Sequence, residues 1–269
     1  MTGCCKRTAG GCGPQRLPER ASAFAVSLLP FRVAFLEATT LSDPTYTVLL
    51  SGGLDSVAAL HWTIEKANGA PVRAVGFSYG QPHRDAEMYA AGLVAKRRGI
   101  PFEGLFLIDL KRLDPTAGLD ANGVSRAFVP CRNGLFLARA TAHAAANGGD
   151  VVLVMGANAD DNAGFPDCRP AFFEAAQAFL RASLAGVCGV TVWTPWVTCS
   201  KVMVLRWALT RPAALEDIRD SVSCYRGTRC GECDACALRA RAFAEVGIQD
   251  GTSQPVYCGG DPHRDAAFK

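Results

Sequence analysis

The sequence predicts an α/β protein, a doubly wound parallel sheet followed by a small cysteine-rich helical subdomain. Three observations lead to this fold class. Short apolar runs alternate with stretches of helical periodicity from Tyr46 onward. A hexapeptide rich in glycine and serine, Ser51–Ser56, stands directly after the first apolar run. Near the C-terminus, four cysteines fall within thirteen residues, between Cys224 and Cys236.

The elements follow from this alternation. The predicted strands are the apolar runs Tyr46–Leu50, Val72–Phe77, Gly104–Leu107, Val151–Met155 and Thr191–Trp193. The predicted helices are Asp55–Lys66, Asp85–Arg97, Asn133–Ala146, Pro170–Ala182 and Ser200–Leu209. Strands separated by helices of this length imply βαβ units and a parallel sheet covered on both faces. Ligands bind such sheets outside the carboxyl ends of the strands.

The chain divides into three predicted parts. Residues 1–44 form an N-terminal extension that is partly disordered or adds a hairpin over Phe24–Leu36. Residues 45–220 form the α/β domain. Residues 221–269 hold the cysteines, a short helix through Phe243 and a polar tail.

Composition excludes some classes of protein. A chain of 269 residues with 49% hydrophobic content is long enough to bury a core. Its net charge of +3 is too small to indicate a nucleic-acid or membrane surface. No apolar stretch approaches the roughly 20 residues that a membrane span needs. We therefore expect no membrane partner and no direct binding of nucleic acid.

The hexapeptide Ser51-Gly52-Gly53-Leu54-Asp55-Ser56 reads as a strand end, a tight turn and a helix start. Glycine lets the backbone approach a ligand closely, and the helix N-terminus offers free N–H groups to an anion. It is not a Walker A loop, because no Gly-Lys-Ser/Thr follows. An ordinary glycine-rich turn is the simpler alternative. We interpret the hexapeptide as a phosphate loop that is similar to the SGGxDS loop of the N-type ATP pyrophosphatases.

The four clustered cysteines, Cys224, Cys230, Cys233 and Cys236, supply thiolates joined by compact loops. Structural zinc takes four sulfur ligands in this arrangement. An iron–sulfur cluster is the rival, although its fourth cysteine is often distant in sequence, and four loose buried thiols are the simplest alternative. We therefore favour zinc over iron. Because cysteines fill all four coordination positions, we expect the ion to be structural.

Further motifs carry a resemblance to a known family, the QueC family of 7-cyano-7-deazaguanine synthases. The cysteine segment from Ser223 to Arg239 resembles the zinc motif of that family. Three other stretches resemble family motifs in family order, namely Tyr79–Arg84, Val129–Asn133 and Phe165–Arg169. The resemblance covers about residues 46–245 and implies an adenine nucleotide α-hydrolase-like, Rossmann-like fold.

The resemblance also implies a reaction, that of an ATP-dependent C–N ligase. ATP adenylates the carboxylate of 7-carboxy-7-deazaguanine, ammonia converts the acyl-adenylate to an amide, and a second adenylation leads to the nitrile. The implied cofactors are ATP, Mg²⁺ and structural zinc. An ATP-using chain with many free thiols belongs in a reducing cytoplasm. Members of the family are often homodimers.

Residue roles follow from the matching positions. The phosphate loop, Ser51, Gly52, Gly53, Leu54, Asp55 and Ser56, is expected to hold pyrophosphate, and Tyr79 and Gln81 to contact the nucleotide. The expected catalytic residues are Asp55 near Mg²⁺, Lys201 at phosphate and Arg132 at a carboxylate or phosphate. The expected substrate residues are Asp161 and Asp167 at the N–H edge of the base, Phe165 as a stacking face, and Arg169.

The sequence departs from the family pattern on the acceptor side. The family has other residues where Ser78, Pro82, Ala86 and Cys131 stand here, and its loop corresponding to Lys111–Arg126 is longer. Loops at the carboxyl ends of strands shape substrate access. Two hypotheses therefore stay open: a synthase that makes the free nitrile, or a QueC-like enzyme of an antiphage defence operon that joins the activated deazaguanine to an amine of a protein or other macromolecule.

Overall fold

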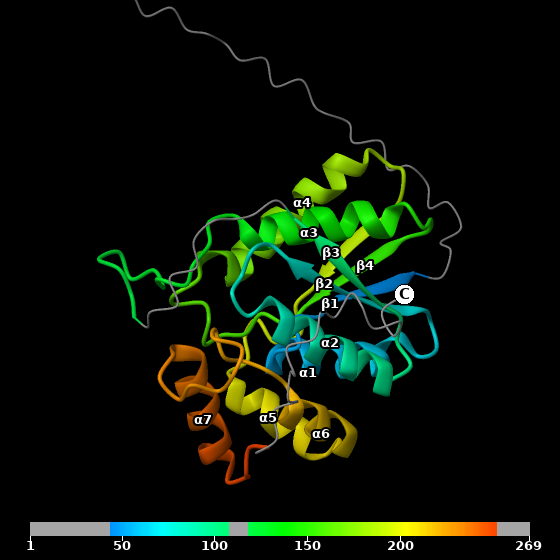
Figure 1. The fold of residues 1–269 in the computed structure, drawn as a ribbon. Helices are drawn as coiled ribbons and strands as arrows, with labels where there is room; N and C mark the ends of the chain where they lie inside the picture. The colour runs from blue at the N-terminus through cyan, green and yellow to red at the C-terminus, as the bar shows by residue number, and fades with distance from the viewer. Residues whose placement is uncertain (1–43, 108–117, 252–269) are drawn as a thin grey trace, which may run out of the picture. The chain divides into compact units, whose positions relative to one another are not determined.

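Five strands form one parallel sheet in the order β3-β2-β1-β4-β5 (Figure 1). The computed structural model describes residues 44–107 and 118–251. The strands are β1 (Thr45–Leu49), β2 (Val72–Ser78), β3 (Phe102–Phe106), β4 (Val151–Met155) and β5 (Val190–Trp193). All four neighbouring pairs run parallel, which confirms the predicted sheet.

Helices cover both faces of this sheet. Those of the α/β layers are α1 (Leu54–Ala67), α2 (Arg84–Arg97), α3 (Arg132–Ala145), α4 (Pro170–Leu184) and α5 (Lys201–Leu209). A 3-10 turn η1 (Pro166–Cys168) precedes α4, and α6 (Pro212–Asp220) and α7 (Asp234–Val246) complete the described chain. Figure 1 shows α3 and α4 on one face of the sheet and α1 and α2 on the other.

The alternation of side chains along the strands explains this double covering. Val48 of β1 packs in the core with residues of α1, α2, α5 and α6, whereas the next residue, Leu49, packs in the core with residues of α3 and α4. Successive side chains of a strand point to opposite faces, so an unbroken apolar run indicates a strand buried on both sides. The doubly wound fold class is confirmed.

The chain changes face between β3 and β4, which places the switch point of the sheet between β1 and β4. The helices that follow β1 and β2 lie on one face, and those that flank β4 lie on the other. Adjacent connections leave a crevice at the carboxyl ends of the strands at such a point. The phosphate loop begins there, directly after β1.

Helix α6 was not expected from the sequence. Its buried residues are Ala214, Asp217 and Ile218, so a carboxylate occupies a position that would be apolar in an ordinary amphipathic helix. The predicted hairpin over Phe24–Leu36 lies outside the described residues. Among the described residues, no helix is long and apolar enough to cross a membrane.

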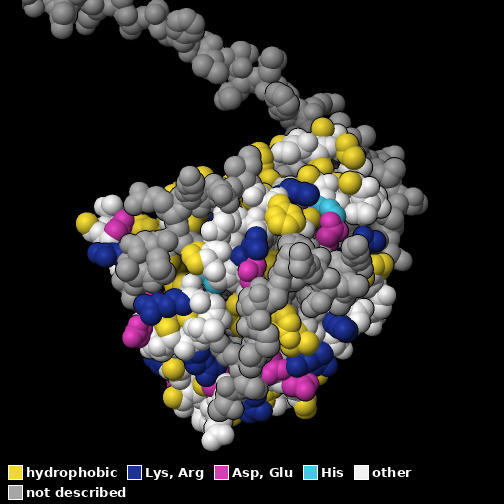
Figure 2. All heavy atoms as spheres, in the orientation of Figure 1, with side chains coloured by type: hydrophobic (Ala, Val, Ile, Leu, Met, Phe, Trp, Pro, Cys, Tyr) yellow, Lys and Arg dark blue, Asp and Glu magenta, His cyan; other side chains and the backbone are white. Residues whose placement is uncertain are grey.

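Charges of both signs share the surface seen in Figure 2. Lys and Arg side chains lie beside Asp and Glu side chains in several places, with hydrophobic side chains between them. This mixture is the pattern expected of a chain whose net charge is only +3.

Candidate functional site at the carboxyl edge of the sheet

A cavity of about 690 Å³ opens at the switch point of the sheet. The phosphate loop forms part of its wall, with Leu49 and Met155 from the ends of β1 and β4. Lys201, Arg132 and Phe165 also line it, although they come from three different segments of the chain. A cavity of this size holds a nucleotide-sized ligand. The structure therefore brings most of the predicted site residues to one place.

Hydrogen bonds within the phosphate loop fix its shape. The Ser56 hydroxyl accepts from the Ser51 amide at 3.2 Å and donates to the Gly53 carbonyl at 2.9 Å. The two serine hydroxyls lie 3.1 Å apart. Among the described residues, no side chain caps α1 at Gly53, so the first-turn amides stay available to an anion.

Two glycines allow backbones to approach closely at this loop. Gly52 has φ +78°, and a Cβ there would lie 2.6 Å from the carbonyl oxygen of Glu87. A Cβ at Gly156, after β4, would lie 2.5 Å from the carbonyl oxygen of Asp55. The loop is thus pressed between α2 and the end of β4, and neither position accommodates a side chain.

Lys201 is the cation in the part of the cavity wall that adjoins the phosphate loop; we call this part, with Asp55 and Asp161, the phosphate side. It is 6% exposed, and its Nζ lies 3.1 Å from Asp55 Oδ2 and 3.4 Å from Asp161 Oδ1. The Asp160 carboxylate accepts from the Lys201 amide at 2.8 Å and fixes the start of α5. Burial by itself would lower the pKa of Lys201, but the charges of Asp55 and Asp161 outweigh it and raise the pKa. The amine therefore stays protonated.

One carboxylate oxygen of Asp55 has no partner among the described residues. Burial raises the pKa of Asp55, against the opposing charge of Lys201. Its Oδ1 is buried and has no hydrogen-bond partner among the described residues. A buried polar atom without a partner is costly, and a carboxylate oxygen in this position is a ligand that Mg²⁺ accepts. The donor set fits the expected Mg²⁺, with Asp55 as the residue that would hold it.

Arg132 stands at the start of α3 on the other side of the cavity. Its Nη1 donates to the Tyr79 hydroxyl at 3.5 Å, and its guanidinium lies 5.9 Å from the Tyr79 ring centre and 5.8 Å from that of Phe136. Among the described residues, no carboxylate forms an ion pair with it. Burial raises the pKa of Tyr79 to about 12, so this phenol stays protonated. An unpaired planar cation between aromatic rings suits a carboxylate or phosphate ligand.

The backbone of Cys131, the residue before Arg132, adopts an unusual conformation. Cys131 adopts φ +63°, the left-handed region that favours glycine, which is the residue that the motif resemblance led us to expect there. It caps α3 with its backbone, and Arg132 begins the helix. The replacement of glycine by cysteine therefore puts strain at the start of the helix that carries Arg132.

The Phe165–Arg169 segment supplies a second polar group. The Asn133 amide donates to Asp167 Oδ2 at 3.2 Å, while Asp167 Oδ1 is buried and lacks a hydrogen-bond partner among the described residues. Burial raises the pKa of Asp167. Phe165 lines the cavity, so it stands where a flat ring could stack.

Three residues that were expected to contact the substrate or the nucleotide, Gln81, Arg169 and Asp161, make other contacts. The Gln81 amide closes its own turn, since its Nε2 donates to the Phe77 carbonyl at 2.8 Å and its Oε1 accepts from the Tyr79 amide at 2.9 Å. Arg169 is exposed and donates to the Asn162 carbonyl at 2.9 Å. Neither is among the residues that line the cavity, and the expected site residues Asp167 and Gly52 are not among them either. Asp161 lies at Lys201, on the phosphate side, and its contact with a base stays a prediction.

One wall of the cavity was not predicted from the sequence. Helix α7 contributes Asp234, Leu238 and Arg241, which share a face through the three- and four-residue spacing of a helix. The Asp234 carboxylate accepts from the Gly118 amide at 3.0 Å, which joins this wall to the loop after β3. His83 and Glu87 also line the cavity; their Nε2 and Oε1 atoms lie 3.5 Å apart.

The four clustered cysteines converge at the start of α7. Their Sγ atoms all lie within 4.8 Å of one another. Tetrahedral zinc with bonds of about 2.3 Å places its sulfur ligands at comparable separations, so the donor set fits a metal ion. The amides of Glu232 and Cys233 donate to Cys230 Sγ at 3.4 Å each and lower the pKa of this thiol to about 6. A thiolate is the form that binds metal.

Comparison with known proteins finds a family model and relatives that match most of this chain. The family model described as "Queuosine biosynthesis protein QueC" matches residues 45–247. The 7-cyano-7-deazaguanine synthase of Acinetobacter baylyi is 36% identical over 225 residues, which cover 78% of this chain and 94% of the relative. The enzyme of the same name from Anaeromyxobacter dehalogenans is also 36% identical, with 76% and 93% covered.

A solved structure with a similar backbone is the U34-tRNA thiolase NcsA from Methanococcus maripaludis with its [4Fe-4S] cluster. It is 17% identical, with a TM-score of 0.40, and the match covers 82% of this chain and 77% of that chain. Likeness at this level carries no argument about the metal or the reaction.

Proposed function

This chain belongs to the QueC family, and on that basis we propose that it is an ATP-dependent 7-cyano-7-deazaguanine synthase. The observation that carries the proposal is the convergence of the phosphate loop, Lys201 and Arg132 on one cavity. All three lie within the part of the chain that matches the family model. The substrates are 7-carboxy-7-deazaguanine, ATP and ammonia.

The first step is adenylation of the substrate carboxylate. A carboxylate oxygen attacks the α-phosphorus of ATP, and the bond from that phosphorus to pyrophosphate breaks. The first-turn amides of α1 and the protonated Lys201 lie where they can stabilise the negative charge of the leaving pyrophosphate. Mg²⁺, when bound at Asp55, would supply further positive charge to the phosphates.

The second step is amidation. Ammonia attacks the acyl carbon, AMP leaves with the former carboxylate oxygen, and the nitrogen loses a proton. Arg132 can hold the substrate carboxylate before activation, and the apolar cavity wall of Leu49, Phe77 and Met155 limits the access of water to the acyl-adenylate. Adenylation of the amide oxygen, followed by loss of AMP and the remaining N–H proton, gives the nitrile.

The base has its own candidate contacts. Asp167 Oδ1 is a buried acceptor without a partner among the described residues, and Phe165 offers a ring face at the cavity. A site built to accept an N–H discriminates strongly against a ligand that lacks it, because the buried acceptor then stays unpaired. Both aspartates stay candidates for the base edge: Asp161 lines the cavity, whereas Asp167 does not line it but keeps a buried oxygen without a partner among the described residues.

The test is incubation of the purified protein with ATP, Mg²⁺ and 7-carboxy-7-deazaguanine, with and without ammonium, followed by mass spectrometry. The expected result is the nitrile in the presence of ammonium, together with AMP and pyrophosphate. Accumulation of acyl-adenylate or amide without nitrile would contradict the proposal. The other acceptor hypothesis would then be tested by a mass increase of one deazaguanine unit on a protein.

A further inference from the structure

A short segment beside the phosphate loop, Ser221–Ser223, links the end of α6 to Cys224, and its residues Val222 and Ser223 line the cavity. The Val222 amide donates to the Gly52 carbonyl at 2.9 Å. A Cβ placed on Gly53 would lie 3.5 Å from the Val222 carbonyl oxygen. Val222 therefore lies against the phosphate loop at Gly52 and Gly53, so this segment supports the loop in addition to α2 and the end of β4.

One buried guanidinium holds the segment. Arg239 of α7 is 3% exposed, and its Nη1 donates to the Ser221 hydroxyl at 2.7 Å, the Ser221 carbonyl at 3.2 Å and the Ser223 hydroxyl at 3.2 Å. Its Nη2 donates to the Ile218 carbonyl at 2.8 Å and the Arg219 carbonyl at 3.3 Å. The Ile218 carbonyl also accepts from the Ser221 backbone amide at 3.2 Å and the Ser221 hydroxyl at 2.6 Å, so Arg239 joins a hydrogen-bonded turn that ends α6.

Arg239 is itself fixed from its other side. Asp250 accepts from its Nε and Nη2 at 2.8 Å each, a bidentate pair. Asp250 also pairs with Arg229, which lies between the first two cysteines of the cluster, at 2.8 Å. The Arg239 guanidinium stands 5.1 Å from the Phe243 ring centre. Its planar fork is therefore held in one orientation.

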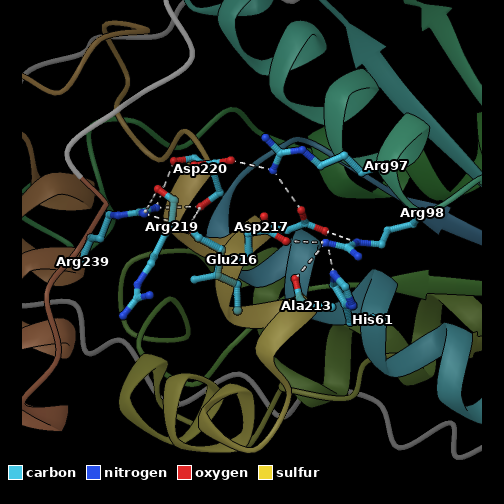
Figure 3. Close-up of polar contacts among 11 residues, drawn as sticks. His61, Arg97, Arg98, Ala213, Glu216, Asp217, Arg219, Asp220 and Arg239 are labelled. Atoms are coloured by element: carbon cyan, nitrogen blue, oxygen red, sulfur yellow. Dashed lines mark hydrogen bonds and ion pairs between the residues drawn. The ribbon is translucent and has the colours of Figure 1, made fainter.

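Helix α6 is anchored separately at its other flank. Asp217, 0% exposed, accepts from Arg98 Nε at 2.6 Å and Arg97 Nη1 at 3.2 Å, and pairs with His61 Nε2 at 2.8 Å. Figure 3 shows these three side chains reaching Asp217 from one side, with Arg239 at the opposite end of the network. Arg97 also pairs with Asp220, the last residue of α6, at 2.6 Å. The helix is thus held from that side up to its end, and Arg239 holds Ser221 and Ser223, the residues that flank Val222.

We propose that Arg239 is a positioning residue for the ATP site: it holds Ser221–Ser223 so that Val222 fixes the backbone of Gly52. The inference rests on the proposed function, because the phosphate loop is taken as the ATP site. Arg239 does not line the cavity and touches no reacting atom. Cys236 lies one turn before it on α7, and Ser223 directly precedes Cys224, so the cysteine cluster adjoins both ends of this connection.

The test compares Arg239→Lys and Arg239→Ala with Arg206→Ala, an exposed arginine of α5 that pairs with Glu245 at 3.9 Å. Hydrogen exchange is measured on the full chain without nucleotide. Both Arg239 variants are expected to exchange faster over residues 218–224 and 51–56, with the β2 and β3 peptides unchanged. Binding of MgATP by calorimetry is expected to weaken about tenfold, and the KM for the deazaguanine to stay within about twofold.

Unchanged exchange at residues 51–56 in both variants would overturn the proposal, as would equal increases in the KM for ATP and for the deazaguanine. If Arg239→Ala exchanges fast throughout the sheet, Asp250→Asn replaces it, since it loosens the guanidinium but keeps the charge and bulk of Arg239. Metal content is measured on every variant and is expected to stay at the level of the unmodified protein. Hydrogen exchange is measured without turnover. If the wild-type protein has no synthase activity, the proposed function is refuted, but the exchange data still test this inference.

Discussion

The two sides of the cavity treat charge in opposite ways. On the phosphate side, the Lys201 amine sits between Asp55 and Asp161. On the acceptor side, Arg132 forms no ion pair with a described carboxylate; Asp167, which is not among the residues that line the cavity, keeps a buried oxygen without a hydrogen bond among the described residues. The phosphate side holds its cation between carboxylates and leaves only Asp55 Oδ1 without a partner among the described residues, whereas Arg132 on the other side has no such ion pair.

The two sides therefore have different roles: one can form before a ligand binds, and the other discriminates between ligands. The cluster of Lys201, Asp55 and Asp161 can form before any ligand arrives, because the buried amine already has carboxylate partners. Unpaired buried groups cost free energy until a matching substrate enters, and they penalise a ligand that cannot pair with them. We therefore expect the phosphate side to set whether activation occurs and the acceptor side to set which carboxylate is activated.

The largest expected effect comes from Lys201→Ala. The variant leaves Asp55 and Asp161 without their cation and removes a positive charge from the site of the leaving pyrophosphate. Pyrophosphate release should fall about 10²–10³-fold, as on loss of a transition-state donor. Removal of one partner of a buried ion pair should also lower the free energy of unfolding by about 3–5 kcal/mol. A coupled phosphate assay and urea unfolding measure the two effects.

Lys66→Ala serves as the control for Lys201→Ala. Lys66 is exposed in the last turn of α1, with its Nζ 5.9 Å from the Trp62 ring centre, so its loss should change neither readout appreciably. If Lys201→Ala retained pyrophosphate release close to that of Lys66→Ala, the proposed division between the two sides would be wrong.

Arg132→Lys tests the acceptor side and should act on one substrate only. Lysine keeps the charge but loses the planar fork that grips a carboxylate at two points. The KM for 7-carboxy-7-deazaguanine should rise about 10-fold, with MgATP binding unchanged, because a bidentate charged contact contributes about 1.5–3 kcal/mol. Steady-state kinetics and calorimetry separate the two ligands. Arg139→Ala, on the same helix but away from the cavity wall, is the control.

The same contrast explains what the sequence could predict. The phosphate loop is contiguous, so its turn and helix start are visible in six residues, and the sheet follows from unbroken apolar runs. The acceptor side joins Tyr79, Arg132 and Phe165 from three segments, and only motif resemblance connected them. Helix α6 escaped prediction because Asp217 occupies a core position. The wall from α7 and the contacts of Arg239 depend on tertiary packing, which no local pattern encodes.

Asp217→Asn examines the support beneath the phosphate side. Hydrogen bonds from His61 and Arg98, with further help from Arg97, outweigh burial and lower the pKa of Asp217 from 3.8 to about 2. The carboxylate therefore stabilises the fold fully above pH 4, and this contribution disappears as the pH falls through about 2. At pH 7 the variant should lose about 2 kcal/mol, the free energy that corresponds to the lowering of this pKa.

Urea unfolding of the Asp217→Asn variant and the unmodified protein at several pH values checks this. The two free energies of unfolding should differ at pH 7 and converge as the pH falls from 4 to 2, since protonation then removes the charge that the variant lacks. Glu216→Gln is a matched control on the same helix, because Glu216 pairs with Arg98 at the exposed surface. A gap that stayed constant with pH would show that the charge of Asp217 is not what stabilises α6.

The smallest expected effect lies at the start of the helix that carries Arg132. Cys131→Gly places glycine where the backbone has φ +63°. Relief of the left-handed strain should outweigh the entropy that glycine gains in the unfolded chain, and the free energy of unfolding should rise by about 0.5–1 kcal/mol. Because the backbone already adopts this conformation, the KM for 7-carboxy-7-deazaguanine should stay the same within error. A change in that KM would mean that the Cys131 side chain itself shapes the acceptor side, and that this departure from the family bears on the substrate rather than on the helix alone.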